Sequence, residues 1–197
     1  MISPHYGLDH PTTLSPEQAM VLQDKMGGTD GSLQERQSAG NNLRSKLGHY
    51  SGAMFYYEGE WYWGVDRLYH LEARLKSLGA DKSPDQPPLY PRPSNTVSGD
   101  ASALTLEYYL SLRSPYTAVS WEPTMKLVRE SGINLEIKPV LPMVMRGVPA
   151  TRQKGMYIFK DAAREARAQG IIYGKFYDPI GDPVDNTNYA LNWYART

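Results

Sequence analysis

The feature that most constrains the fold is a strand-like segment that leads directly into a helix start. Residues 104–112 are rich in Leu and Tyr, and Arg113-Ser114-Pro115 follows at once. Pro at the first helical position has a suitable φ and loses no hydrogen bond there, and Ser before it can cap a free backbone N–H. The pattern predicts a strand that delivers the Ser114 hydroxyl to the positive end of a helix, where an anion or thiolate is stabilised.

Composition excludes several classes of function. The 197 residues contain 21 Lys and Arg and 21 Asp and Glu, and this zero net charge argues against nucleic acid or an anionic membrane as the main partner. The chain has no Cys, so it cannot be a disulfide oxidoreductase acting alone, and the four His lack the spacing typical of metal ligands. No apolar run approaches the roughly 20 residues of a membrane helix, and the first residues lack the features of a signal peptide. We therefore expect a cytoplasmic protein with no metal.

The first third of the chain predicts helices followed by a hairpin. Residues 1–13 are polar and contain Pro, which favours a flexible arm. Helices are expected at 15–26 and 32–47. The aromatic runs within residues 53–63 are separated by Glu58-Gly59, which predicts a β-hairpin.

An amphipathic helix is expected directly after the hairpin. Asp66 is its predicted N-cap and Gly79 its end. Four leucines at helical spacing predict one buried stripe, and they are Leu68, Leu71, Leu75 and Leu78. We assign residues 14–79 to this first folded region.

A Pro-rich segment at 80–103 is expected to be a linker or a strap along the surface. Beyond it, residues 104–197 predict a strand at 104–112, a helix at 115–131 and a strand at 134–141, which together form a β-α-β unit. Pro123 should kink or divide that helix. A further helix is expected at 152–169, where Asp161 and Arg164 form a helix-face pair at three-residue spacing.

Several of these motifs resemble one protein family. The strand ending in Ser114-Pro115-Tyr116, the strand ending in Lys138-Pro139-Val140-Leu141 and the pattern Lys154-x-x-Tyr157-x-x-x-Asp161-x-x-Arg164 are similar to the front half of a DsbA-like thioredoxin domain. The run from Phe55 to Leu68 resembles the closing hairpin and helix start of the back half. The family is that of 2-hydroxychromene-2-carboxylate isomerase and kappa-class glutathione S-transferase.

The resemblance implies an α/β, thioredoxin-like (DsbA-like) mixed sheet with a helical insert, assembled in circularly permuted order because the back half comes first. The strand at 104–112 would lie antiparallel beside 53–58 in one sheet of about four strands. The helices at 15–47 and 152–169 would form the insert. Two origins remain open: the middle of a tandem two-domain protein, or one permuted domain. A homodimer is compatible with either.

The resemblance also implies a site for glutathione. Ser114 would be the catalytic residue, because the matching hydroxyl hydrogen-bonds the glutathione sulfur. Lys154 would hold a carboxylate, Asp66 the amino end, and Tyr116 would lie beside the substrate. Ala53 stands where the family has a cis-proline and will not adopt a cis bond without a cost of roughly 3 kcal/mol. Each of these residues also has a structural interpretation, as a helix cap, a solvated charge or a packing residue.

Two hypotheses of function follow. The first is a glutathione-dependent isomerase or transferase that acts on a small electrophilic substrate. The second is a non-catalytic thioredoxin-fold interaction module, or a degenerate or truncated fragment of a tandem protein. The first predicts that Ser114, Lys154 and Asp66 converge around one cleft.

Overall fold

The fold is described from a computed structural model, which describes residues 30–94, 96–175 and 177–194. The expected arm at 1–13 and the expected helix at 15–26 lie outside these residues. The chain divides into two compact units, residues 1–48 and 49–197. In the first unit, α2 (Asp30–Lys46) confirms the predicted second helix, and Gly48 follows it with φ of 82°. Within the described ranges, no helix is long and apolar enough to cross a membrane.

The second unit begins with the predicted hairpin. Strands β1 (Met54–Tyr57) and β2 (Glu60–Trp63) are antiparallel, with Tyr57 opposite Glu60. Glu58 and Gly59, the two residues between them, both have positive φ, 42° and 85°. Two left-handed residues are what a tight two-residue hairpin turn requires. The turn predicted from Glu58-Gly59 is therefore confirmed.

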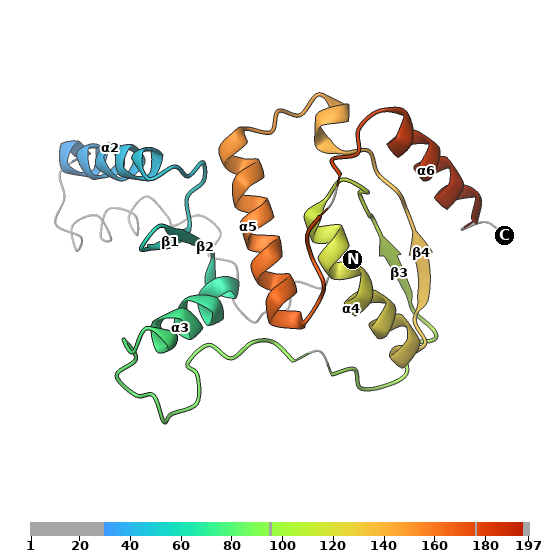
Figure 1. The fold of residues 1–197 in the computed structure, drawn as a ribbon, viewed down its shortest axis with the longest axis horizontal. Helices are drawn as coiled ribbons and strands as arrows, with labels where there is room; N and C mark the ends of the chain where they lie inside the picture. Colours follow the sequence, from blue (N-terminus) through green and yellow to red (C-terminus); the bar gives the residue numbers. More distant parts are fainter. Residues whose placement is uncertain (1–29, 95, 176, 195–197) are drawn as a thin grey trace. The chain divides into compact units, whose positions relative to one another are not determined.

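The predicted β-α-β unit is also present (Figure 1). Strand β3 (Thr105–Tyr108) lies parallel to β4 (Asn134–Ile137), with Glu107 opposite Glu136, and α4 (Pro115–Ser131) connects them. Lys138, just beyond β4, has its Nζ 3.0 Å from Glu107 and 2.9 Å from Glu136. Pro123 lies inside α4, which is continuous across it. Of the two expected effects of Pro123, division of the helix was wrong, and a kink stays a prediction.

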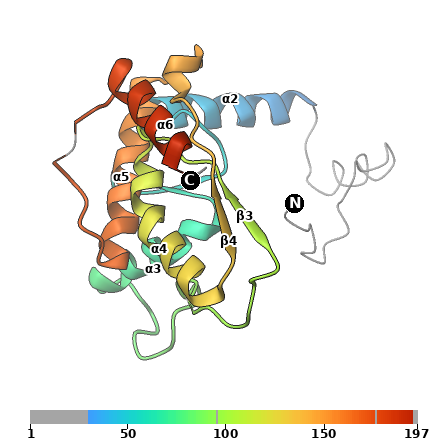
Figure 2. The same ribbon diagram turned by 90° about the vertical axis from the view of Figure 1, so that its right-hand side faces the viewer.

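Helix α5 (Arg152–Gln169) lies between the hairpin and α4 (Figures 1 and 2). Thr151 caps its start and the left-handed Gly170 ends it. On the α4 side, Ala162 and Ala166 are fully buried and form a small core with Val119. The 3₁₀ turns η1 (Val65–Arg67) and η2 (Met143–Arg146) and helices α3 (Leu68–Ser77) and α6 (Asp182–Tyr194) complete the described elements.

In the described ranges the strands form two separate two-stranded sheets, so the expected single mixed sheet of about four strands was wrong. The hairpin meets α5 through side chains instead of pairing with β3. Arg164 on α5 donates from Nη1 to the carbonyl of Trp61 at 3.2 Å, and its guanidinium lies 4.4 Å above the ring of Tyr62, which is 1% exposed. The guanidinium of Arg164 thus donates to a β2 carbonyl that could otherwise accept a hydrogen bond from a neighbouring strand. The structure supports a mixed α/β class.

The Pro-rich segment has no helix or strand in its described part. Residues 80–94, which we call the strap, run past α3. Glu72 on α3 accepts hydrogen bonds from the backbone N–H groups of Leu89 and Tyr90, at 2.7 and 2.8 Å. Farther along, Arg92 donates to the carbonyl of Ala168 at the end of α5. The strap is thereby held to two helices of the second unit.

Candidate functional site

Ser114 is the N-cap residue of α4. Its backbone is extended, and its hydroxyl accepts a hydrogen bond from the backbone N–H of Thr117 at 3.4 Å. Pro115 occupies the first turn, as predicted. Because a hydroxyl has one donor and two acceptor positions, accepting this bond leaves the O–H of Ser114 as a donor. The predicted cap is confirmed, and its geometry is compatible with a second role.

Tyr116 fastens the start of α4 to the middle of α5. Its hydroxyl donates to Oδ2 of Asp161 at 2.8 Å, and Asp161 is only 1% exposed. Burial raises the pKa of Tyr116, and the negative charge of Asp161 and their hydrogen bond raise it further. Tyr116 therefore stays protonated and donates. In this structure it is a residue that positions the helix.

Asp161 is held chiefly by a residue far away in the sequence. Arg67 donates from Nε to both carboxylate oxygens, at 3.1 and 3.2 Å, and from Nη2 at 3.1 Å. Arg164 lies 3.6 Å away, which confirms the predicted pair on the face of α5. A carboxylate this deeply buried costs several kcal/mol unless it is paired and hydrogen-bonded, and here both conditions are met.

Glu165 lies one helical turn after Asp161 on α5 and belongs to the same network of contacts. It accepts hydrogen bonds from the Tyr69 hydroxyl at 2.5 Å and interacts with His70 Nε2 at 2.8 Å and with Arg67 at 3.3 Å. Burial by itself would raise the pKa of Glu165, but the contacts with His70, Tyr69 and Arg67 outweigh it and lower that pKa to about 2. We call Arg67, Asp161, Arg164 and Glu165 the buried charge cluster.

Asp66 does not cap α3, so that prediction was wrong. The chain enters the helix through η1, which begins after Gly64, and Arg67 is the N-cap position of α3 without a side-chain cap. A Cβ at Gly64, where φ is 65°, would lie 2.9 Å from Oδ1 of Asp66. The carboxylate of Asp66 is 71% exposed and pairs with Nη1 of Arg67 at 2.9 Å. The 3₁₀ turn η1 thus stands at the start of α3, where a side-chain cap by Asp66 was expected.

Lys154 and Ala53 have separate surroundings. Lys154 lies in the first turn of α5, and its Nζ is 4.0 Å from Sδ of Met143 in η2. Ala53 precedes β1 with φ of 55°, and its carbonyl accepts a hydrogen bond from Gly64 at 3.0 Å. No peptide bond in the described part of the chain is cis.

The structure thus links some of the predicted residues. Asp66 contacts Arg67, Arg67 contacts Asp161, and Asp161 contacts Tyr116, which is two residues from Ser114. Lys154 and Ala53 make contacts outside this chain of interactions. Convergence of Ser114, Lys154 and Asp66 on one cleft stays a prediction. Chemically, the start of α4 can stabilise an anion, whereas the buried charge cluster is satisfied internally and holds elements together.

Sequence reasoning missed the importance of Arg67 and Glu165. Arg67 stood inside the motif Gly-x-Asp-Arg-Leu, directly beside Asp66, but its partner is 94 positions away. Glu165 lies four residues after Asp161, so both carboxylates fall on one face of α5. Two acidic residues on the side of the helix that also carries Ala162 and Ala166 were the available signal for a buried cation.

Comparison of the chain with protein-family models, curated proteins and solved structures finds no match. The family resemblance therefore depends on the motifs alone. No group of three or more His, Cys, Asp or Glu side chains among the described residues is arranged to hold a metal ion.

Proposed function

We propose that this chain is a glutathione-dependent isomerase or transferase in which Ser114 stabilises the glutathione thiolate. The observation that carries the proposal is the half-buried Ser114 hydroxyl at the N-terminus of α4, a helix of 17 residues. Partial positive charge at a helix N-terminus and a hydroxyl donor both favour a thiolate over a thiol. The sequence resemblance assigns the sulfur to the same hydroxyl.

The residues present fit glutathione at its charged ends. Lys154 offers an ammonium on the first turn of α5, which packs beside α4 (Figure 2). Asp66 exposes most of its carboxylate, although one oxygen is engaged by Arg67. In the proposal Lys154 binds a carboxylate of glutathione and Asp66 binds its amino group. When bound, glutathione would supply the thiolate that adds to an electrophilic double bond and leaves again after bond rotation.

The protein's own part is to position the glutathione sulfur and to lower the pKa of its thiol. Ser114 would donate its hydroxyl proton as a hydrogen bond and keep it, so that the residue is neither acid nor base. Tyr116 and Asp161 would fix the direction of the α4 N-terminus, since their hydrogen bond ties that turn to α5. No oxidation or reduction is needed, which agrees with a chain that contains no Cys.

A thioredoxin-like fold belongs to the same proposal. The parallel unit of β3, α4 and β4 supports it, because a strand that leads into a helix N-terminus presents Ser114 at the carboxyl end of the sheet. The hairpin and α3 would supply the second half of the fold's elements. Ala53 in place of a proline removes one binding edge, and we therefore expect affinity for glutathione on the order of millimolar.

The test is to measure the thiol pKa of bound glutathione from thiolate absorbance. Ser114→Ala removes both the cap and the donor, whereas Ser114→Asp keeps a good cap but replaces the donor by a negative charge. We expect both variants to raise the bound thiol pKa by about one unit or more. Ser45→Ala, at an exposed position on α2, is the control and should leave it unchanged.

If Ser114→Asp binds glutathione with an unchanged thiol pKa, Ser114 is only a helix cap and the catalytic proposal fails. The second candidate would then stand, a non-catalytic interaction module. It is favoured by one observation: in the described part of the chain, β1–β2 and β3–β4 do not join, so each sheet keeps an edge without a partner strand. Such edges are places where another chain can add a strand.

A further inference from the structure

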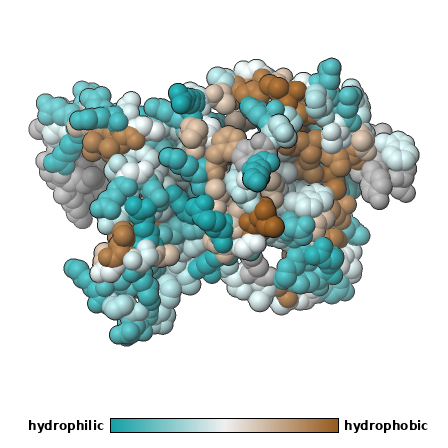
Figure 3. Space-filling model, viewed as in Figure 1, coloured by the Kyte–Doolittle hydropathy of each residue, from teal (hydrophilic) through white to brown (hydrophobic). Residues whose placement is uncertain are grey.

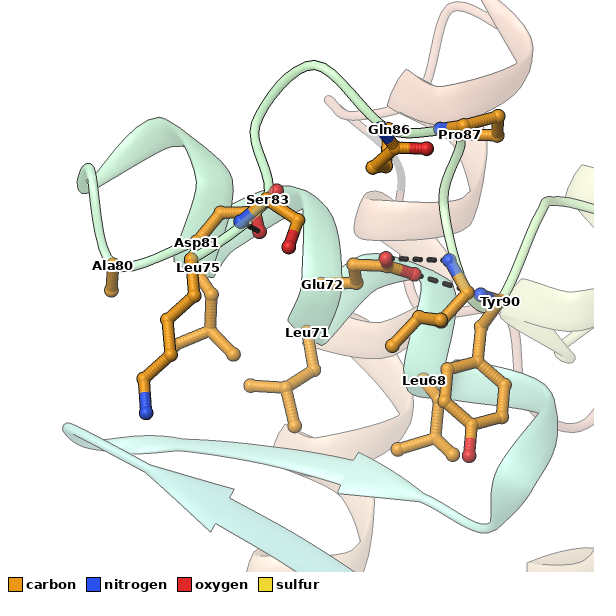
Figure 4. Close-up of a pocket in the computed structure, with 12 residues that line it drawn as sticks. Leu68, Leu71, Glu72, Leu75, Ala80, Asp81, Ser83, Gln86, Pro87 and Tyr90 are labelled. Atoms are coloured by element: carbon orange, nitrogen blue, oxygen red, sulfur yellow. Dashed lines mark hydrogen bonds between the residues drawn. The ribbon is translucent and has the colours of Figure 1, made fainter.

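A cavity of about 590 Å³ lies between α3 and the strap (Figure 4). On the helix side it is lined by Leu68, Leu71 and Leu75, and on the strap side by Pro87 and Leu89 among others. Its volume falls within the roughly 300–1,000 Å³ that is usual for small-molecule sites. The stripe of four leucines predicted to be buried is therefore not buried: Leu68, Leu71 and Leu75 are half-buried and line this space, and Leu78 is 54% exposed.

Side chains of α3 hold the cavity open by fixing the strap at two points. The two oxygens of Glu72 bind the backbone N–H groups of Leu89 and Tyr90, as the dashed lines in Figure 4 show. One turn along the helix, Nζ of Lys76 donates to the carbonyl of Pro84 at 2.7 Å. Because these bonds anchor the backbone of the strap, it bridges the leucines at a set distance instead of collapsing onto them.

The charged side chains of the cavity wall differ in whether they already have hydrogen-bond partners. Both carboxylates are engaged: Glu72 by the strap, and Asp81 by the N–H of Ser83 at 2.8 Å. Lys82 also lines the cavity. Within residues 30–94, 96–175 and 177–194, the structure gives Lys82 no carboxylate partner. Both carboxylates keep their negative charge, but their oxygens already accept hydrogen bonds from the strap. Lys82 offers a charged donor with which the anionic group of a ligand can pair.

We propose that this cavity binds a small amphipathic carboxylate. The aliphatic or aromatic body of the ligand lies against Leu68, Leu71 and Leu75, and its carboxylate pairs with Lys82. Apolar burial supplies most of the affinity and the single charge fixes the orientation. In the space-filling view a small apolar patch lies over α3 on an otherwise hydrophilic part of this face (Figure 3). The site is distinct from Ser114 and does not depend on the function proposed above.

The test is calorimetric titration of the native chain with decanoate, decanol and decyltrimethylammonium, each kept below its micelle concentration. We expect decanoate to bind best and the cation worst. Lys82→Glu should weaken decanoate binding about fivefold and leave decanol unaffected, because it reverses one exposed charge. Lys160→Glu makes the same change in charge on an exposed position of α5 and is the matched control.

A second variant examines the apolar wall. Leu71→Trp fills the cavity and should weaken decanoate and decanol together, with circular dichroism showing that the helices remain. The proposal is overturned if decanoate does not bind, or if Lys82→Glu and Lys160→Glu reduce its binding equally, which would indicate a response to net charge alone. If Leu71→Trp fails to fold, the comparison at Lys82 decides.

Discussion

Asp161 and Glu165 are two buried carboxylates on one face of α5, and their sets of hydrogen-bond and ion-pair partners share Arg67. Asp161 has Arg67, Arg164 and the Tyr116 hydroxyl, whereas Glu165 has Tyr69, His70 and the same Arg67. Arg67 therefore pairs with both carboxylates. Burial alone would lower the pKa of the Arg67 guanidinium, but the contacts with Asp161 and Glu165 outweigh burial and raise that pKa. The cluster is an internal ion network of four charged side chains.

The low pKa of Glu165 predicts a loss of stability in acid. Its pKa in the folded chain is about 2, below the ordinary 4.5, so its stabilising contribution is present above about pH 4.5 and disappears as the pH falls through 2. We expect a contribution on the order of 3 kcal/mol to the free energy of unfolding. Urea unfolding of the native chain and Glu165→Gln at pH 7 and at pH 2.5 measures it.

The difference in unfolding free energy between native chain and Glu165→Gln should shrink markedly at the lower pH. Glu130→Gln, at a surface carboxylate paired with Lys126, is the control and should change stability little at either pH. A difference between native and Glu165→Gln that stays constant with pH would mean that Glu165 is not preferentially charged in the folded state.

At the scale of elements, α4 carries an unfavourable residue at its centre. Pro123 has no N–H to donate to the carbonyl of Val119, and a proline inside a helix ordinarily costs about 3 kcal/mol. The helix nevertheless continues from Pro115 to Ser131, since its buried face, including Val119, packs against α5. Packing of an amphipathic face thus overrides the local signal from which a divided helix was expected.

Pro123→Ala should therefore stabilise the chain, by about 1–3 kcal/mol, because it restores a hydrogen bond and removes a steric conflict. The measurement is the free energy of unfolding in urea. Glu122→Ala, at the exposed neighbouring position, should change it by less than about 0.5 kcal/mol. Destabilisation by Pro123→Ala would show that the proline ring contributes packing that outweighs its backbone cost.

The elements themselves were largely predictable from the sequence, and their partners were not. The hairpin followed from aromatic runs around Gly59, and α4 from Ser114-Pro115, because turn and cap chemistry are local. The pairing of Arg67 with Asp161 joins positions 94 apart, and no periodicity within either segment encodes it. The same limit explains the error in the sheet: strand patterns in 53–63 and 104–112 predict strands without stating which strand each one joins.

At the scale of the second unit, the buried charge cluster is a main connection between the hairpin with α3 and the pair α4–α5. Arg67 follows the hairpin in sequence and pairs with Asp161 and Glu165 on α5. In the opposite direction, Arg164 on α5 donates a hydrogen bond to the Trp61 carbonyl of the hairpin. The two small sheets thus belong to one compact unit although no backbone hydrogen bond joins them in the described residues.

Arg67→Met should uncouple the hairpin from the rest of the second unit. Removing one partner of a buried ion network commonly costs about 3–5 kcal/mol. We expect amide hydrogen exchange in β1, β2 and α3 to become at least about tenfold faster, with little change in α4 and β4. Lys126→Met, which breaks an exposed pair, is the control. Equal acceleration in all elements would instead show that the second unit opens only as a whole.

The arrangement of Lys138 between Glu107 and Glu136 has a consequence for how β3 and β4 find each other. Side chains alternate between faces along a strand, so a slip of one residue would carry Glu136 away from Glu107 and place an apolar residue opposite that glutamate. Only the native alignment lets one ammonium group neutralise both carboxylates. The charge triplet therefore distinguishes the correct alignment of these short strands from its nearest competitors during assembly.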